Sequence, residues 1–259
     1  MMTSVVIPAT RPQDLLRIVQ ALLAQGVVPE SLTVVDDSAD GVVTWERPEE
    51  PIRVLRSFRS GSSAARNLGA RSVSSEWVVF LDDDVAIEDD FWASLEDFIR
   101  GQPDKVGLIE GRVVPVGDIV RPYWSNRVVE SSRPGAFLTA CLAVRKEAFD
   151  AVGGFSARSP IAYREDTEFG LKVCQAGWSH VWWDRPGVQH PIETMSFDRF
   201  VGLARLFVND SDFEGRFPGY LDGQARIRHV GGVKVRGVRR RFPRLPLAPR
   251  CSWPRSDGR

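Results

Sequence analysis

The stretch Trp77–Val85, WVVFLDDDV, places five strand-forming residues directly before three aspartates. The run Trp77–Leu81 has no polar alternation, which is typical of a strand buried on both faces of a parallel α/β sheet. Ligands bind such sheets just beyond the carboxyl ends of the strands. Neighbouring carboxylates repel one another and are hard oxygen donors, so Asp82, Asp83 and Asp84 favour a site for Mg²⁺ or Mn²⁺. The alternative is a solvated acidic turn that ends the strand.

The N-terminal part of the chain predicts the order strand, helix, strand. Ser4–Ile7 is a short apolar run closed by Pro8, and apolar residues recur at helical spacing after Pro12. Thr10 is a candidate cap for that helix. Leu32–Val35 predicts a second strand, which also ends in two aspartates. This order favours a parallel, right-handed crossover, and the turn PATRP lacks the glycine patterns of dinucleotide-binding and P-loop proteins.

The rest of the chain continues the alternation of strands and helices. Ser60–Ser72 is a small-residue loop entering a helix, where Arg66 adds a fixed cation to the free N–H groups of the helix start. The link Val116–Pro134 is polar and holds Trp124, so we expect a substrate-facing loop. Strands are predicted at Ile52–Leu55, Val106–Ile109, Ala136–Val144 and Val181–Trp183. Helices are predicted after a cap at Asp89 or Asp90, and at Lys146–Val152, Glu165–Gln175 and Phe197–Val208.

Composition predicts one folded domain with a basic extension. The chain has 259 residues, of which 43% are hydrophobic and 26% charged, so a sizeable core is expected. We place an α/β domain at residues 1–210 and a partly disordered C-terminal extension at 211–259. Residues 224–259 hold 11 basic and one acidic side chain, a net charge of +10, whereas residues 1–223 hold 23 and 33, a net charge of −10. The basic segment indicates either a flexible arm for an anionic membrane surface or a solvated end.

The cysteines and the apolar runs predict a cytoplasmic location. Cys141, Cys174 and Cys251 are odd in number, far apart and without metal-ligand spacing, so they are interpreted as free thiols of a reducing compartment. No apolar run reaches the ~18 residues of a membrane span, and the N-terminus has no signal-peptide pattern. We therefore expect a cytoplasmic protein that can contact the inner face of a membrane peripherally.

Seven motifs stand in order between residues 3 and 191: VVIPATRP, VVDDSADG, SSAARNLGARS, VVFLDDDV, VRKEAFDAVGGF, REDTEFGLKVCQAGW and VQHP. This ordered set resembles the successive motifs of family 2 glycosyltransferases. The resemblance implies the GT-A fold, a single Rossmann-like α/β domain with a mixed, mostly parallel sheet flanked by helices. It also implies transfer of a sugar from a nucleotide-diphosphate donor, aided by Mn²⁺ or Mg²⁺, with inversion at the anomeric carbon. The expected donor is a UDP-hexose.

The resemblance assigns the donor site to several positions. Pro8, Ala9 and Thr10 stand where the first loop of the family borders the base. Asp37 matches the carboxylate that hydrogen-bonds the base edge, and Arg66 matches an arginine near the nucleotide. The family commonly has an aromatic residue and an asparagine after the proline, and Ala9-Thr10-Arg11 departs from that pattern.

The triple aspartate matches the DxD segment of the family. Asp82 and Asp83 are assigned to the donor, with Asp83 facing the ribose, and Asp84 is assigned to the metal. His190 matches a histidine that often completes the metal shell. The alternative for His190 is a loop histidine whose hydrogen bonds are satisfied within the protein.

The resemblance also implies where the catalytic base lies. Asp166, in the pair Glu165-Asp166, matches the base that takes the proton of the acceptor hydroxyl. Its place at a helix N-terminus is expected to keep it ionised. Glu165 and Trp124 are candidates for contact with the acceptor. Helix capping by the two acids and core packing by Trp124 are the alternatives.

Other functions remain open from the sequence. A sugar-1-phosphate nucleotidyltransferase would need a glycine-rich loop where PATRP stands. A non-catalytic nucleotide-sugar-binding protein would be expected to lack Asp84 or Asp166, and a retaining enzyme of the same fold differs only in product stereochemistry. The acceptor is a glycan, a lipid-linked saccharide, a peptide or a small molecule, and the acidic body disfavours nucleic acid.

Overall fold

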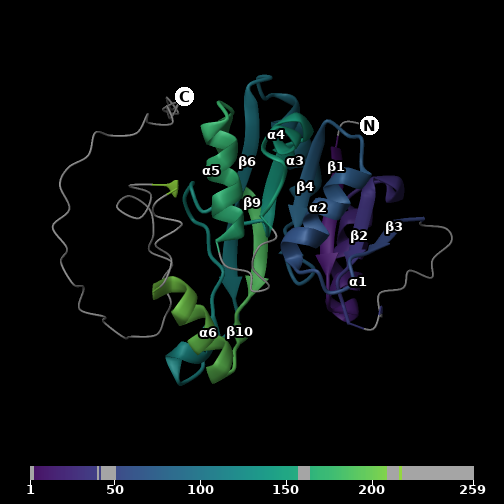
Figure 1. Cartoon of the computed structure of the whole chain (residues 1–259). Helices are drawn as coiled ribbons and strands as arrows, with labels where there is room; N and C mark the ends of the chain where they lie inside the picture. Colours follow the sequence, from purple (N-terminus) through teal and green to yellow (C-terminus); the bar gives the residue numbers. More distant parts are fainter. Residues whose placement is uncertain (1–2, 40, 42–50, 157–163, 209–215, 218–259) are drawn as a thin grey trace, which may run out of the picture.

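The centre of the molecule is an eight-stranded sheet with the order β3-β2-β1-β4-β8-β6-β9-β5 (Figure 1). The computed structural model describes residues 3–39, 41, 51–156, 164–208 and 216–217. A second sheet pairs β10 with β7. The strands are β1 (Thr3–Ala9), β2 (Leu32–Asp36), β3 (Arg53–Arg56), β4 (Trp77–Leu81), β5 (Ala86–Ile87), β6 (Val106–Val116), β7 (Asn126–Arg127), β8 (Cys141–Arg145), β9 (Ser179–Pro191) and β10 (Glu193–Thr194).

Most strands of the large sheet run in one direction. The pairs β1–β2, β2–β3, β1–β4 and β6–β9 are parallel. Strand β8 runs antiparallel to both β4 and β6, and β5 runs antiparallel to β9. The carboxyl ends of β1, β2, β3, β4, β6 and β9 therefore meet at one edge, and the predicted mixed, mostly parallel sheet is confirmed.

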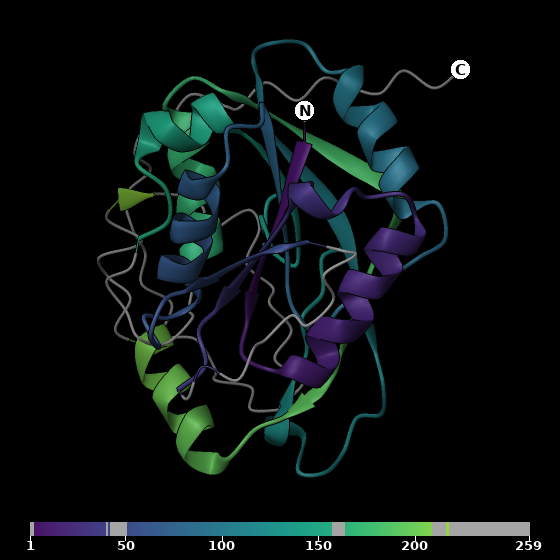
Figure 2. The same cartoon turned by 90° about the vertical axis from the view of Figure 1, so that its right-hand side faces the viewer.

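Helices cover both faces of this sheet. Helices α1 (Pro12–Ala24) and α3 (Phe91–Arg100) share one core with the odd-numbered residues of β4. Helices α2 (Ser62–Ser72), α4 (Lys146–Val152) and α5 (Glu165–Gln175) pack on the opposite face with Val78 and Phe80. Figure 2 shows α1 in purple and α2 in blue on opposite sides of the sheet. All five residues of β4 are buried, as the apolar run predicted.

The last helix, α6 (Phe197–Val208), lies with β10 beyond the carboxyl edge of the sheet (Figure 1). It contacts the short helix η2 (Tyr123–Ser125), which precedes β7. A further short helix, η1 (Pro29–Ser31), leads into β2. The link Val116–Pro134 therefore contains η2 and β7, which sequence periodicity did not predict.

Two boundaries differ from the sequence prediction for a physical reason. Arg11, not Thr10, is the N-cap residue of α1, and the N–H of Thr10 donates instead to Asp83. The strand predicted at Val181–Trp183 continues to Pro191, because β9 pairs with β6 along its length. This pairing needs a glycine at position 187, since a side chain there would meet the backbone oxygen of Arg112.

A buried carboxylate explains why the strand predicted from Ala136 starts only at Cys141. Glu110 of β6 is fully buried, and it accepts the N–H groups of Gly135, Ala136 and Phe137 at 2.7, 3.0 and 2.7 Å. It also lies 3.1 Å from Nε2 of His180. Because these N–H groups bond to a side chain and not to a neighbouring strand, the backbone at 135–137 stays irregular although it is internal.

The proposed boundary at residue 210 is not decided by the described residues. Phe217 is 6% exposed, and Arg216 lies 2.7 Å from Glu168 of α5, so this short piece packs on the domain. The basic segment 224–259 lies outside the described residues. Within the described part of the chain, none of the helices has both the length and the apolar character needed to span a bilayer.

Candidate active site at the carboxyl edge of the sheet

The predicted site residues gather where the strands end. Strands β1, β2 and β4 lead into Thr10, Asp37 and the triple aspartate, and β9 carries its site residue near its carboxyl end. Helices α2 and α5 begin at the same edge. Side-chain distances connect five of the predicted residues into one group: Arg66, Asp82, Asp84, Asp166 and His190.

Three of these side chains fit a divalent cation. One ligand atom from each of Asp82, Asp84 and His190 lies within 4.8 Å of the others. Nε2 of His190 is 3.6 Å from Oδ1 of Asp84 and 3.9 Å from Oδ2 of Asp82. Nδ1 of the same ring lies 2.8 Å from the carbonyl oxygen of Pro191, which only accepts hydrogen bonds. Nδ1 therefore donates to this carbonyl, and Nε2 is turned toward both carboxylates.

The surroundings of Asp84 support the same interpretation. Its Oδ1 is buried and has no hydrogen-bond partner among the described residues. Burial raises the pKa of Asp84, and the nearby His190 and Arg11 only partly oppose this effect. An orphaned carboxylate oxygen buried beside the second carboxylate of Asp82 is unfavourable unless a cation lies between them. The donor set of two carboxylates and one imidazole fits Mn²⁺ or Mg²⁺.

Arg66 is the buried cation at the centre of the group. Its Nη2 donates to Oδ1 of Asp82 at 2.8 Å, and its Nη1 lies 3.6 Å from Oδ1 of Asp166 and 3.9 Å from Oε1 of Glu165. Despite burial, which opposes ionisation, these carboxylates raise the pKa of Arg66. Burial also opposes ionisation of Asp82, but the guanidinium lowers its pKa. Nε and Nη1 of Arg66 have no hydrogen-bond partner in the part of the chain that is described.

The position of Arg66 is fixed by its neighbour in α2. Asn67 donates from Nδ2 to the carbonyl oxygen of Phe155, and the N–H of Phe155 donates to Oδ1 of Asn67, both at 2.8 Å. Gly154, with φ +83°, leaves space for this amide, since a Cβ there would lie 2.4 Å from Oδ1 of Asn67. The turn after α4 therefore anchors α2 and holds Arg66 at the site.

Asp166 presents one oxygen to the protein and leaves the other without a hydrogen bond. Its Oδ2 accepts the N–H of Thr139 at 3.1 Å and the hydroxyl of Thr139 at 2.9 Å. Its Oδ1 is buried and has no hydrogen-bond partner within the described ranges. The sequence analysis considered only the helix N-terminus, which lowers a carboxyl pKa. Burial dominates instead and raises the pKa of Asp166, although Arg66 and Thr139 oppose it.

The two other donor-site carboxylates hold loops of the protein. Oδ1 of Asp37 accepts the hydroxyl of Ser57 at 2.6 Å, and Oδ2 accepts the N–H of Gly61 at 3.0 Å. Oδ2 of Asp83 accepts the N–H groups of Thr10 and Arg11 at 2.8 and 3.0 Å. Both acids thereby shape the edge of the site, and their assigned contacts with base and ribose stay predictions.

The remaining donor-site residues lie on the first strand and the loop after it. Pro8 and Ala9 are buried in β1, where Pro8 pairs with Val35 and Ala9 with Asp36. Thr10 is exposed. The side chains of Pro8 and Ala9 belong to the sheet, so Thr10 is the residue of the three that is open to a ligand. The contact of this loop with the base stays a prediction.

Trp124 lies apart from the charged group. It packs against Phe197 and Phe200 of α6, with ring centroids 5.2 and 5.5 Å away. Its connection to the site runs through the small sheet, in which Arg127 of β7 donates to Glu193 of β10 at 2.8 Å. Glu165 lies closer to the centre of the site, beside Arg66. Contact of Trp124 or Glu165 with an acceptor stays a prediction.

Three residues of the site were not predicted from the sequence. Nη2 of Arg11 lies 2.7 Å from Oδ2 of Asp84 and 3.1 Å from Oδ1 of Asp83, and its Nη1 donates to Glu193. Thr139 holds Asp166. Arg11 could have been predicted, because it follows the first strand and the neighbouring strands end in aspartates. Thr139 and Glu193 have no local sequence pattern that indicates these contacts.

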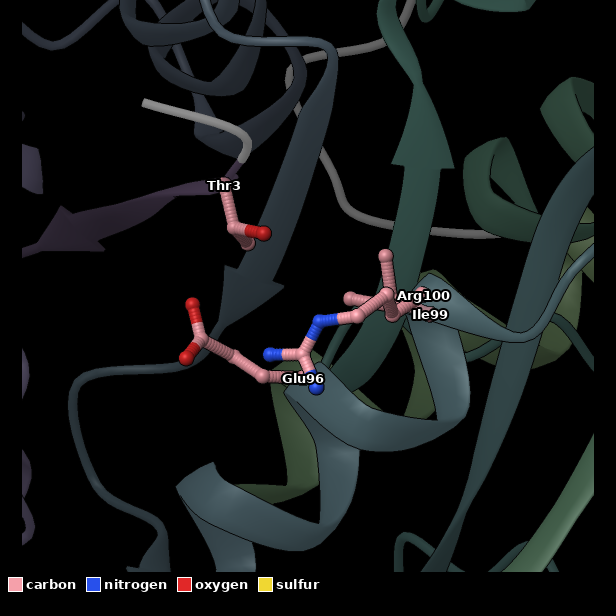
Figure 3. Close-up of a pocket in the computed structure, with 4 residues that line it drawn as sticks. All are labelled: Thr3, Glu96, Ile99 and Arg100. Carbon is pink, nitrogen blue, oxygen red and sulfur yellow. The ribbon is translucent and has the colours of Figure 1, made fainter.

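A separate small pocket of about 200 Å³ is lined by Thr3, Glu96, Ile99 and Arg100 (Figure 3). It lies between the first residue of β1 and the last turns of α3. Because Thr3 starts the strand whose other end leads to the site, this pocket is at the opposite edge of the sheet. It contains none of the predicted site residues.

Comparisons with known proteins identify the family to which the chain belongs. A family model described as "Glycosyl transferase family 2" matches residues 4–162. A relative in Haemophilus influenzae, named "Uncharacterized glycosyltransferase", is 25% identical over 187 residues, which cover 67% of this chain and 62% of the relative. The chain thus spans less than two thirds of that relative's length.

Two further matches are more limited. "N-acetylglucosaminyl-diphospho-decaprenol L-rhamnosyltransferase" of Mycobacterium tuberculosis is 39% identical over 69 residues, 26% of this chain and 22% of that protein. The solved structure of S. aureus TarS in complex with UDP-GlcNAc superposes with a TM-score of 0.56 at 17% identity, covering 80% of this chain and 65% of that chain. The similarity to the TarS structure supports the fold alone.

Proposed function

This chain belongs to glycosyl transferase family 2, and from that premise we propose that it is an inverting, metal-assisted glycosyltransferase. It moves a sugar from a nucleotide-diphosphate donor to an acceptor hydroxyl. The observation that carries the proposal is the placement of Arg66 between two carboxylates, 2.8 Å from Asp82 and 3.6 Å from Asp166. One carboxylate belongs to the candidate metal group, and the other has an oxygen, Oδ1, that makes no hydrogen bond within the described residues.

The donor side of the site is the part around Arg66, Asp84 and His190. Mn²⁺ or Mg²⁺ would be held by Asp84, His190 and Asp82, and when bound it neutralises charge on the diphosphate leaving group. The N–H groups of Arg66 that make no hydrogen bond to the described residues are suited to donate to phosphate oxygens. Asp37, Asp83 and the loop at Thr10 would border the nucleoside.

The acceptor side is the part around Asp166. Its Oδ1 would accept the proton of the acceptor hydroxyl as the new glycosidic bond forms. The bond from the anomeric carbon to the diphosphate oxygen breaks, and its electron pair leaves with the nucleoside diphosphate. Attack from the face opposite the leaving group inverts the anomeric carbon. Thr139 holds Oδ2 of Asp166 and so directs Oδ1 toward the substrate.

Donor and acceptor are proposed by class. A UDP-hexose is the proposed donor, as the resemblance of the motifs to family 2 glycosyltransferases implies, and the TarS structure that shares the fold is a complex with UDP-GlcNAc. The name of the mycobacterial relative, which includes a diphospho-decaprenol, supports a lipid-linked saccharide among the glycan, lipid-linked and small-molecule acceptors. A basic segment at 224–259 in contact with an anionic membrane would suit such an acceptor.

Two alternatives with other chemistry are weaker. A sugar-1-phosphate nucleotidyltransferase has no need of a buried base such as Asp166 beside the arginine. A non-catalytic nucleotide-sugar-binding protein would not need an oxygen of Asp166 that lacks a partner within the described ranges. Retention in place of inversion is distinguished by the anomeric configuration of the product.

The test is a donor-hydrolysis screen with the full chain. A panel of UDP-, GDP- and dTDP-sugars is incubated with Mn²⁺, and the nucleoside diphosphate released is measured. Release from one class of donor, lost on addition of EDTA and in Asp84→Asn, is the expected result. Formation of nucleoside triphosphate from sugar-1-phosphate would instead favour the nucleotidyltransferase, and donor binding without any release would favour the binding protein.

A further inference from the structure

Two arginines hold the candidate metal-binding aspartates from opposite sides. Arg11 donates to Oδ2 of Asp84 at 2.7 Å, and Arg66 donates to Oδ1 of Asp82 at 2.8 Å. The other oxygen of each carboxylate is turned toward Nε2 of His190, at 3.6 and 3.9 Å. Each aspartate therefore offers one oxygen to the space beside the histidine, and an arginine occupies the other.

Arg11 is itself held in place from several directions. Its Nη2 also lies 3.1 Å from Oδ1 of Asp83, while its Nη1 donates to Glu193 of β10. Its backbone N–H donates to Oδ2 of Asp83 at 3.0 Å. Glu193 is fixed in turn by Arg127 of β7. Because the guanidinium is planar and anchored at both Nη atoms, it cannot follow Asp84 if that carboxylate rotates.

We propose that Arg11 is a positioning residue that sets the metal selectivity of the site, by restricting Asp84 to one ligand oxygen. This inference rests on the metal-assisted function proposed above. Mg²⁺ requires a compact octahedral shell, to which a carboxylate contributes one oxygen, whereas Ca²⁺ takes six to eight oxygens and accepts bidentate carboxylates. With Oδ2 of Asp84 bound to Arg11, the site lacks the extra oxygen that Ca²⁺ favours.

A purely electrostatic role for Arg11 makes a different prediction. A fixed positive charge near the cation weakens the binding of every divalent ion, and Mn²⁺ and Ca²⁺ carry the same charge. Loss of that charge would strengthen binding of both ions by a similar factor. The ratio of the dissociation constants for Ca²⁺ and Mn²⁺ therefore isolates the effect of oxygen number from the effect of charge.

The experiment measures direct binding of Mn²⁺ alone and Ca²⁺ alone to the full chain by calorimetry, with Mn²⁺ paramagnetic resonance as a second readout. Wild type is expected to prefer Mn²⁺. In Arg11→Met, which removes every side-chain donor of this residue, the Ca²⁺-to-Mn²⁺ ratio of dissociation constants is expected to fall by about tenfold, because Asp84 becomes free to bind through both oxygens. The matched control is Arg100→Met on α3, where an exposed arginine pairs with Asp97 of its own helix.

A second variant covers the case in which Arg11→Met does not fold. Glu193→Gln leaves every residue of the metal group intact but loosens the anchor of Arg11, and it should shift the ratio in the same direction by a smaller factor. If Arg11→Met folds and its ratio stays within twofold of wild type, this inference alone is overturned. If Arg11→Met does not fold, the same result in Glu193→Gln overturns it. A wild-type chain that binds neither ion overturns both this inference and the metal-assisted step of the proposed function.

Discussion

Thr139 donates twice to Asp166, from its backbone N–H at 3.1 Å and from its hydroxyl at 2.9 Å, and both bonds reach the same oxygen, Oδ2. The residues lie on different elements, since Thr139 precedes β8 and Asp166 is in the first turn of α5. Hydrogen bonds of this kind favour the ionised carboxylate and oppose the effect of burial on its pKa. The balance between burial and the hydrogen bonds from Thr139 sets the pH at which the proposed base becomes active.

Thr139→Val should move the activity of the enzyme to higher pH. The change removes the hydroxyl donor, so the ionised form of Asp166 loses stabilisation and its pKa rises further. A hydrogen bond to a charged group is worth about 1.5–3 kcal/mol. The apparent pKa of the acid limb in the pH profile of kcat/KM should therefore rise by about one unit. Thr139→Ser keeps the hydroxyl and should restore the wild-type limb. Superimposable pH profiles for Thr139→Val and wild type would contradict the assignment.

Asp166→Asn should abolish transfer while leaving donor binding intact. The amide cannot accept the proton of the acceptor hydroxyl, and general-base catalysis is typically worth roughly 10²–10⁴-fold in rate. Donor affinity from nucleotide titration and kcat from product formation are the two measurements. Asp150→Asn on α4, where an exposed aspartate pairs with Lys146, is the matched control. Collapse of donor affinity with unchanged kcat would assign Asp166 to donor binding instead.

The same substitution should stabilise the fold at neutral pH. Burial raises the pKa of Asp166 in the native protein. Above that pKa the ionised carboxylate is therefore less stable in the native state than in the unfolded chain, and it lowers the free energy of unfolding. The melting temperature of Asp166→Asn should therefore exceed that of wild type. As pH falls through the native pKa, wild-type Asp166 becomes protonated and the difference should shrink. Circular-dichroism melts across acidic to neutral pH measure it, and a difference that grows toward low pH would refute this account.

Asp84→Asn should remove most metal-dependent turnover without unfolding the protein. The side chain lies at the edge of the sheet, and its Oδ1 contributes no hydrogen bond within the described residues, so the fold does not depend on that oxygen. The matched control is Asp97→Asn, which changes an exposed aspartate of α3 that pairs with Arg100. Unchanged turnover in Asp84→Asn, or full wild-type turnover in excess EDTA, would argue against a metal at this position.

The basic segment should bind anionic membranes through its charge. Residues 224–259 carry +10, and each Lys or Arg near an anionic surface contributes about 1 kcal/mol. The full chain should therefore sediment with anionic vesicles at low salt and be released as salt shortens the Debye length to roughly 8 Å and below. A chain truncated after Gly223 should not sediment but should retain donor hydrolysis. Sedimentation of neither protein would leave the segment without a membrane role.

Much of the fold was predictable because its signals are local. Helices α4, α5 and α6 have the predicted bounds, since apolar spacing and glycine turns mark them within a short window. The apolar run of β4 followed by acids indicated both a buried strand and the edge at which ligands bind. Ordered motifs then identified Asp82, Asp84, Arg66, Asp166 and His190, which the structure brings together.

The sequence by itself determined that Asp37 and the triple aspartate follow strands that end at one edge of the sheet, but tertiary structure alone decided which further residues join them and how their atoms are paired. Arg11 and Asp84 are 73 positions apart, and Arg11 and Glu193 are 182 apart, so no local period links them. The register of β9 against β6 decided that His190 lies buried in a strand. Burial also raised the pKa of Asp166 against the helix N-terminus. Pairing of individual oxygens and desolvation depend on long-range packing, which local sequence does not encode.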